Sequence, residues 1–195
     1  AATDAAYNRP PVAVCQPVTV NADANCEATV AAEAFDGGSS DPDMDMLTFS
    51  VDPAGPYELG VTNVTLTVSD GTEMSQCTTS VTVLDVTPPV VTCAEFSQTF
   101  SGEDQCADAI VQNNPTGMFS PIGDLTMFSA AAGGSRVITA DLSGCVADNC
   151  LSEGLQAAFV DSYEENRVAG CSVDIINVVV IRDAADNEAE DSIFF

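Results

Sequence analysis

The residues best suited to bind an ion form a short acidic loop in the first half of the chain. Asp41, Asp43 and Asp45 stand at alternate positions, and Asp36 precedes them. Carboxylates at alternate positions of a turning loop can converge on one hard cation, and Ca²⁺ takes about six to eight oxygen ligands. Met44 stands where such loops usually have glycine. We predict a calcium site at these four aspartates, with a solvated loop that binds no ion as the alternative.

Two smaller acidic groups offer weaker cation sites. The first comprises Asp183, Asp186, Asn187 and Glu188, in a predicted turn near the end of the chain, where a polar turn without an ion is the simpler interpretation. The second is Asp85, which lies just before a pair of prolines at the junction between two halves. A cation at Asp85 would stiffen this junction, although the prolines already do so.

Cysteines predict disulfides in this chain, because there is no histidine and no Cys-x-x-Cys pair to build a zinc or iron–sulfur site. Disulfides persist in oxidising compartments, so we expect an extracellular or cell-surface protein. The candidates are all eight cysteines: Cys15, Cys26, Cys77, Cys93, Cys106, Cys145, Cys150 and Cys171.

Flanking sequence suggests how some of these cysteines pair. Cys15 and Cys77 each precede a Val-Thr-Val segment, so a parallel pairing of the first and last strands would bring them together. In the second half, either Cys150 or Cys145 pairs with Cys171, or Cys145 and Cys150 close a small loop. The first half has three cysteines and the second half has five. If every thiol is oxidised, at least one disulfide therefore crosses between the halves or between molecules.

The charge of the chain restricts its partners. It has 30 acidic residues and only 4 basic ones, all arginine, for a net charge of −26. Nucleic acids and anionic membranes attract basic surfaces, so neither is an expected partner. Disorder is the other common cause of such a charge, but 46% hydrophobic residues argue for folded domains. No segment is long enough for a transmembrane helix.

Catalysis is not expected. General-base chemistry near neutral pH usually employs histidine, which is absent. A carboxylate pair could serve a glycosidase, but such sites need aromatic sugar platforms, and the chain has no tryptophan and 3 tyrosines. No nucleophile-elbow or phosphate-loop motif is present. We therefore predict that the protein is not an enzyme.

An internal repeat sets the domain organisation. Pro10–Cys15 reads Pro-Pro-Val-Ala-Val-Cys, and Pro88–Cys93 reads Pro-Pro-Val-Val-Thr-Cys, 78 residues later. We predict a lead-in at 1–9 that serves as a docking strand, a first domain at 10–87, and a diverged second domain at 88–195 with an insertion near 107–135. Alternating apolar residues predict short strands, including Val12–Val20, Cys26–Phe35 and Val61–Val68, and a hairpin turn at Asp70-Gly71. Pro17 interrupts the first of these and marks an edge or a bulge. A short helix is expected around Leu125–Ala132. The predicted fold class is all-β, with two tandem immunoglobulin-like antiparallel β-sandwiches.

The first copy resembles a known family of repeats. It carries, in order, the segments Pro10–Cys15, Asn25–Ala28, Gly38–Asp43, Pro53–Tyr57, Leu59–Asp70 and Cys77–Pro89. This order of motifs resembles the hyalin-repeat (HYR) family and the related bacterial PKD-like surface repeats. The second copy matches only at its edges, and Asp191 stands where the closing-strand cysteine would be. The resemblance implies an immunoglobulin-like sandwich in an extracellular adhesive or structural protein, and it implies no reaction.

These observations favour two functions. In the first, the chain is the self-assembling subunit of an extracellular fibre, sheath or surface polymer. It is held by disulfides, stabilised by calcium, and joined to copies of itself by strand addition or edge contacts. In the second, it is a two-repeat fragment of a larger surface adhesin that binds a protein or glycan. Strong mutual repulsion between acidic copies, which cations would screen, motivates the first interpretation.

Overall fold

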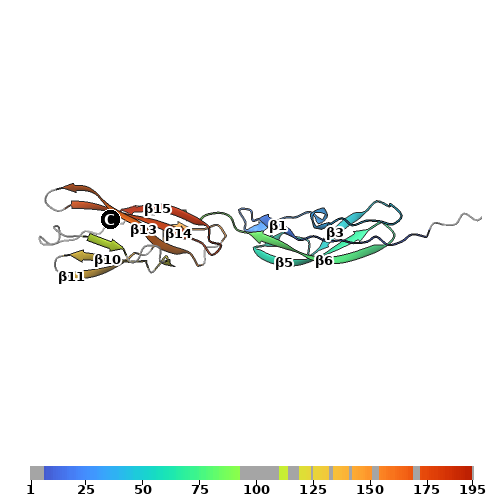
Figure 1. The fold of residues 1–195 in the computed structure, drawn as a ribbon, viewed down its shortest axis with the longest axis horizontal. Coiled ribbons are helices and arrows are strands. Elements are labelled where there is room, and N and C mark those ends of the chain that lie inside the picture. The colour runs from blue at the N-terminus through green and yellow to red at the C-terminus, as the bar shows by residue number, and fades with distance from the viewer. Residues whose placement is uncertain are drawn as a thin grey trace, which may run out of the picture. The chain divides into compact units, whose positions relative to one another are not determined.

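The computed structural model describes residues 7–92, 110–113, 119–123, 125–131, 134–140, 142–150, 154–168 and 172–194. The chain forms two compact units, Ala1–Val86 and Thr87–Phe195, each built from short strands (Figure 1). Apart from one 3-10 helix, the regular structure of the described residues is entirely β, so the predicted fold class of two immunoglobulin-like sandwiches is confirmed. The part of the chain described here contains no helix long and apolar enough to cross a membrane.

The first unit is a sandwich of a larger and a smaller sheet. The larger has the order β1-β6-β5-β3, and the smaller pairs β2 with β4. Their bounds are β1 (Val18–Asn21), β2 (Glu27–Ala28), β3 (Thr48–Asp52), β4 (Tyr57–Glu58), β5 (Gly60–Ser69) and β6 (Met74–Leu84). The long strands β5 and β6 form an antiparallel hairpin (Figure 1). Its turn includes Asp70-Gly71, as predicted.

Strict alternation in the sequence builds the core of this unit. Val64, Leu66 and Val68 of β5 are at most 1% exposed, because successive side chains of a strand point to opposite faces. Phe35 and Tyr57 complete the core with an edge-to-face contact at 6.2 Å between ring centroids. Burying each large apolar side chain contributes about 1.5–3 kcal/mol relative to leaving it exposed.

The predicted strand over Cys26–Phe35 is wrong. Only Glu27–Ala28 forms a strand there, β2, and Ala32–Phe35 forms the 3-10 helix η1. Cys26 has a positive φ of 65°, which is incompatible with a strand. The last five residues of the predicted strand, Ala31–Phe35, also contain none of the β-branched residues that favour strands. Within η1, Phe35 is the residue that reaches the core.

The strand predicted over Val12–Val20 is interrupted at Pro17, as expected, and only its last part is a regular strand. Regular pairing begins only at Val18, after Pro17, which cannot donate to a ladder. Before it, Val12 and Cys15 make isolated bridges to Ser40 and Asp36. The segment that leads into β1 is therefore attached to the loop that follows η1.

Three sheets make up the described part of the second unit. Their orders are β15-β14-β13-β9, β11-β10-β8 and β12-β7. The bounds are β7 (Val90–Val91), β8 (Ile110–Asn113), β9 (Ser120–Pro121), β10 (Leu125–Ala131), β11 (Gly134–Ala140), β12 (Val146–Ala147), β13 (Gln156–Val168), β14 (Ser172–Arg182) and β15 (Glu188–Phe194). The buried core described here includes Leu142, Leu155, Val179 and Ile181.

The predicted helix around Leu125–Ala132 is wrong. These residues form the strand β10, which pairs antiparallel with β11 on one side and with β8 on the other. Pairing on both edges uses the backbone donors and acceptors that a helix would have used internally, so tertiary context overrides the helical propensity of alanine and leucine. Both β8 and β10 lie in the predicted insertion.

The disulfide expected between Cys15 and Cys77 is present, with a Cα–Cα distance of 5.9 Å. Its predicted basis is also present, because β1 and β6 run parallel with Val18 opposite Val81. Cys26, Cys145 and Cys150 are disulfide-bonded as well, and the small loop between Cys145 and Cys150 stays a prediction. Cys93, Cys106 and Cys171 lie outside the described residues, so the predicted pairing with Cys171 stays a prediction.

Candidate cation sites

In the first unit, Asp41 organises the acidic loop through hydrogen bonds to the loop's own backbone. Its Oδ1 accepts the backbone N–H of Asp43 at 2.7 Å and that of Asp45 at 3.2 Å. Met44 has a positive φ of 68°, so the turn closes although it lacks the glycine usual at such a conformation. Within the described part of the chain, these aspartates and Asp36 belong to no group of three or more ligand residues with oxygens within 4.8 Å.

A guanidinium group contacts the same loop. Arg9 donates from Nη2 to Oδ1 of Asp43 at 2.7 Å, and its backbone N–H donates to Oδ2 at 2.8 Å. Nη2 also donates to the carbonyl oxygen of Pro42 at 2.7 Å. The hydrogen bond between the two side chains is the main cause that lowers the pKa of Asp43 and raises the pKa of Arg9. The positive charge beside this loop is therefore supplied by the chain itself.

Asp36, the fourth predicted ligand, also closes a turn. Its Oδ1 accepts the backbone N–H of Ser39 at 2.7 Å and that of Gly38 at 3.2 Å. Hydrogen bonding with Ser39 is the main cause that lowers the pKa of Asp36. Stabilising a carboxylate by backbone donors is a common role for aspartate in turns, and it requires no metal.

Asp70, at the β5–β6 hairpin, lies at the same end of the first unit as Asp43. Its Oδ1 accepts the backbone N–H of Thr72 and of Glu73, each at 2.7 Å. Its Oδ2 accepts Nδ2 of Asn8 at 3.0 Å. The bond from Glu73 is the main cause that lowers the pKa of Asp70. The lead-in residues Asn8 and Arg9 thus contact both acidic turns.

The second unit contains a counterpart of Asp41. In each copy, the valine after the second proline pairs with a residue that directly precedes an aspartate: Val12 with Ser40 before Asp41, and Val90 with Ala147 before Asp148. Asp148 also repeats the local turn, because its Oδ1 accepts the backbone N–H of Cys150 at 2.8 Å, two residues on.

Asp183 is the corresponding counterpart of Asp70, at the hairpin between β14 and β15. Its Oδ1 accepts the backbone N–H of Ala185 at 2.7 Å and of Asn187 at 2.9 Å. Its Oδ2 accepts Nδ2 of Asn187 at 2.8 Å. Asp183 is only 2% exposed. A buried carboxylate with several donors is held in a fixed position, as a ligand must be.

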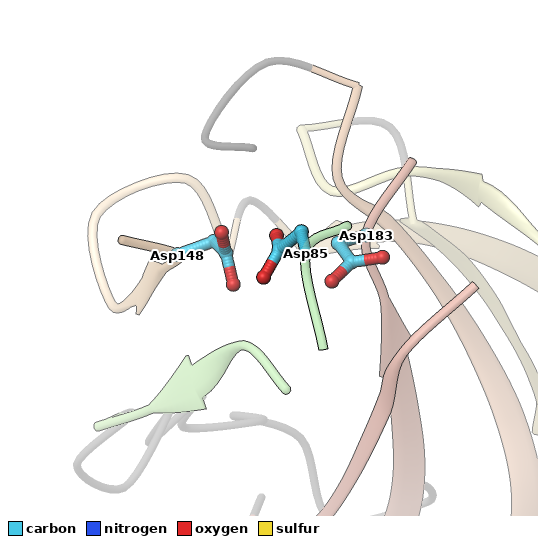
Figure 2. Close-up of side chains that lie close together, drawn as sticks. All are labelled: Asp85, Asp148 and Asp183. Atoms are coloured by element: carbon cyan, nitrogen blue, oxygen red, sulfur yellow. The ribbon is translucent and has the colours of Figure 1, made fainter. Parts of the chain in front are cut away.

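Asp148 and Asp183 come together in the second unit. A carboxylate oxygen of one lies within 4.8 Å of a carboxylate oxygen of the other, and Figure 2 shows both side chains. Two carboxylates at this separation repel each other unless a cation lies near them. In the repeat, Arg9 is in register with Thr87, so the second copy has no arginine at the position that neutralises the first.

The remaining predicted ligands have other contacts. Asp186 forms an ion pair with Arg182 at 3.3 Å. The Arg182 guanidinium also lies 3.9 Å from the ring centroid of Phe119, a cation–π contact. Asp85 is buried near the end of the first unit, with 8% exposed, and its role as a junction ligand stays a prediction.

Sequence reasoning missed Asp148 as a ligand. It lies in Asp148-Asn149-Cys150, which resembles the repeat family but has no second carboxylate nearby in sequence. Only the strand pairing after each Pro-Pro segment shows that it corresponds to Asp41. If the two copies were aligned by the residues that pair with Val12 and Val90, Asp148 would fall opposite Asp41.

Comparison with known proteins gives no family. No family model matches the chain, and no curated protein matches it. Solved structures that match include human protocadherin-24 EC1-2 (14% identity, 96% of this chain, 97% of that chain, TM-score 0.34). Protocadherin gamma B2 extracellular cadherin domains 3-6 also match (12% identity, 95% of this chain, 72% of that chain, TM-score 0.28).

Another match is the endo-fucoidan hydrolase MfFcnA4 from glycoside hydrolase family 107, at 13% identity and a TM-score of 0.29. The alignment covers 95% of this chain but only 28% of the hydrolase. These similarities are too low to support an argument about function. The resemblance to HYR and PKD-like repeats therefore rests on the sequence motifs alone.

Proposed function

We propose that this chain is an extracellular structural protein of the adhesion type that assembles with copies of itself and binds calcium through its second unit. Its disulfides support an oxidising, extracellular or cell-surface location. We propose no catalytic role. The sandwich units supply rigid strands and acidic turns, which suit a structural subunit better than a reaction centre.

The close approach of two carboxylates in the second unit carries the calcium proposal. At the first unit's acidic end, the guanidinium of Arg9 neutralises Asp43. At the equivalent end of the second unit, Asp148 and Asp183 approach within 4.8 Å, and no arginine is in register with Arg9. Carboxylate oxygens held by turns are the ligands that Ca²⁺ prefers, with backbone carbonyls and water completing the shell.

Calorimetry on the full chain tests this proposal. After treatment with a chelator, calcium is titrated into the native protein and into the variants Asp148→Asn and Asp41→Asn. We expect binding by the native chain, at least about tenfold weaker binding by Asp148→Asn, and unchanged binding by Asp41→Asn, its counterpart in the first unit. No binding by the native chain, or equal binding by Asp148→Asn, would contradict the assignment.

A partner-binding role in a larger adhesin is the second candidate. Its support is a group of exposed apolar side chains around the first unit's acidic end: Tyr7 is 85% exposed, Met44 93% and Met46 86%. Flexible methionines and tyrosine are common at protein-binding surfaces. Binding of a surface protein or glycan that is lost in a Met44→Ser, Met46→Ser variant would favour this candidate.

A further inference from the structure

We propose that the Cys15–Cys77 disulfide lets the first unit transmit tension, which passes along the chain across the sulfur–sulfur bond. The inference rests on the structural role proposed above, since only a tethered chain carries tension. It concerns the covalent path through one unit and does not depend on calcium. Three features of the first unit support it: the position of the bond, the conformation of the residues on either side, and the pairing of the first and last strands.

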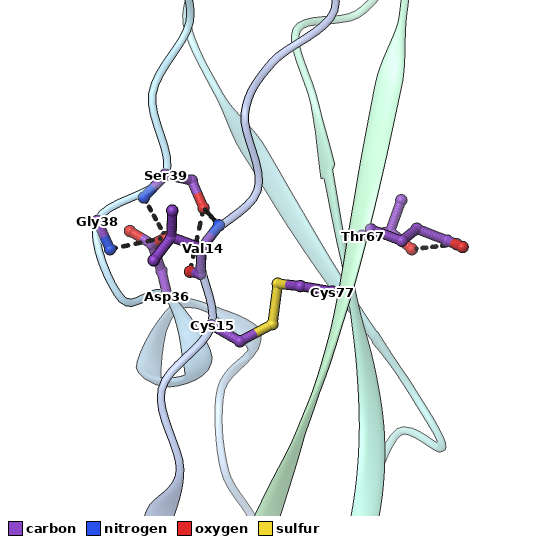
Figure 3. The surroundings of a disulfide bond; sticks show 8 residues. Val14, Cys15, Asp36, Gly38, Ser39, Thr67 and Cys77 are labelled. Carbon is purple, nitrogen blue, oxygen red and sulfur yellow. Dashed lines mark hydrogen bonds between the residues drawn. A yellow bond between two sulfur atoms is a disulfide. The ribbon is translucent and has the colours of Figure 1, made fainter.

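The bond joins the two ends of the unit's fold. Cys15 lies in the segment that enters the unit, before β1, and Cys77 lies in β6, the last strand (Figure 3). The two residues are 62 positions apart. Strands β1 to β5 and η1 all lie between them, inside a covalently closed loop. A force applied at the two ends therefore bypasses most of the unit.

The segments of the first unit outside the closed loop, which carry the force directly, can extend very little further. From Cys77 to Leu84 the path follows β6, which is already extended at about 3.3 Å per residue. Before Cys15, Val12 exchanges backbone hydrogen bonds of 2.7 and 3.1 Å with Ser40. The N–H of Gly37 donates to the carbonyl oxygen of Val14 at 2.7 Å. With the disulfide intact, the unit should lengthen very little under load.

A second restraint would act if the disulfide were reduced. Strands β1 and β6 are parallel over four residue pairs, and the N–H of Ala22 extends the contact to the carbonyl oxygen of Leu84 at 2.8 Å. Pulling the two ends apart draws these strands in opposite directions along their length. All the hydrogen bonds between them are then loaded together, whereas an antiparallel terminal pair would open one bond at a time.

A constant-force measurement on the full chain tests the proposal. The chain is held by its two ends in the presence of dithiothreitol. Because Cys26 belongs to another disulfide, the measurement uses the variant Cys26→Ser, and its free thiols are alkylated. Thiol–disulfide exchange at Cys15–Cys77 would release the closed loop of 62 residues, a step of about 200 Å at 3.3–3.6 Å per residue. We expect such steps, at a rate that rises with the applied force.

The matched control carries Cys15→Ser and Cys77→Ser in the same background. It should show no reductant-dependent steps of this length, while any steps from disulfides of the second unit remain. Absence of the steps in the chain with the disulfide, or a rate independent of force, would overturn the proposal. Calcium calorimetry on the same Cys26→Ser chain reports separately on the proposed cation site, so failure of either is distinguishable from failure of the other.

Discussion

At the residue scale, two of the few basic side chains of this protein act as internal counter-ions for aspartates. Arg9 is the only basic residue in the first unit, and it engages Asp43 through its side chain and backbone. Arg182 pairs with Asp186 in the second unit. An arginine that replaces a metal ion beside a carboxylate loop gives a permanent charge that no chelator can remove.

Replacing Arg9 should create a new cation site in the first unit. In Arg9→Gln, Asp43 loses its positive partner, and the charge of nearby Asp70 already acts on Asp43. We expect calorimetry to show one more bound calcium per chain than in the native protein. Arg9→Lys, which keeps the charge, should bind the native number. An unchanged stoichiometry in Arg9→Gln would show that the loop cannot hold an ion.

Acid should weaken the first unit. Asp36, Asp43 and Asp70 all have pKa values lowered by hydrogen bonds in the folded state. Because the folded pKa values lie below the unfolded value of about 3.9, their stabilisation is present above about pH 4 and is lost as the pH falls through the folded values. Chemical unfolding at pH 7 and at decreasing acidic pH measures this loss.

The variant Asp43→Asn isolates one contribution to the acid dependence. It cannot ionise, so its stability should fall less steeply with acid than that of the native chain. The exposed Asp45→Asn in the same loop is the matched control and should retain the native slope. Identical slopes for all three proteins would mean that the bond between Arg9 and Asp43 does not persist in solution.

At the scale of elements, the segment before β1 is held against the loop after η1 by a close backbone approach. A Cβ at Gly37 would lie 2.9 Å from the carbonyl carbon and oxygen of Cys15. Backbone cannot rotate away as a side chain can, so the segment would have to shift. The disulfide of Cys15 makes such a shift harder.

Gly37→Ala should therefore destabilise the first unit by about 1–3 kcal/mol. Its control is Gly144→Ala, since a Cβ there meets no atom within 4 Å. Thermal unfolding of both variants beside the native chain measures the difference. Equal melting temperatures for the two variants would show that the segment relaxes at little cost.

Much of the fold follows from the sequence, and the failures have physical causes. Alternation predicted β5, and the shared Val-Thr-Val segments predicted the parallel pairing that brings Cys15 to Cys77. The conformation of Cys26, with φ of 65°, and the pairing of β10 on both edges depend on tertiary contacts that no local pattern reports. The alanine-rich segments were therefore the ones assigned wrongly.

The candidate site was predictable only in part. Asp183 was identified from its polar turn, but its neighbour Asp148 lies 35 residues away in sequence. The partner of Asp43 is likewise distant, because Arg9 precedes it by 34 residues. Spacing along the chain can reveal ligands only when they share one loop. Asp148 and Asp183, like Arg9 and Asp43, come from different loops that strand pairing brings together.

At the scale of the whole molecule, a net charge of −26 opposes contact between copies. Screening weakens such repulsion beyond about 10 Å at 0.1 M salt, and bound divalent cations reduce the charge itself. If the chain assembles with itself, the assembly should thus depend on cations. This dependence belongs to the sum of all carboxylates and not to one site.

Light scattering on chelator-treated protein at low salt tests this dependence. We expect a monodisperse species without metal and growth to large particles during a calcium titration, with magnesium as the control ion. Equally large particles in metal-free protein at low salt would show that assembly is not gated by cations.

The closed loop between Cys15 and Cys77 also keeps the chain connected after a proteolytic cut, which matters for a protein outside the cell. A protease that cuts the backbone once between these residues, for example in the exposed stretch from Pro42 to Met46, opens the loop without separating the ends of the unit. The sulfur bridge still joins the residues before Cys15 to the residues after Cys77. Continuity of the chain therefore tolerates a nick anywhere within the 62-residue separation of these two cysteines.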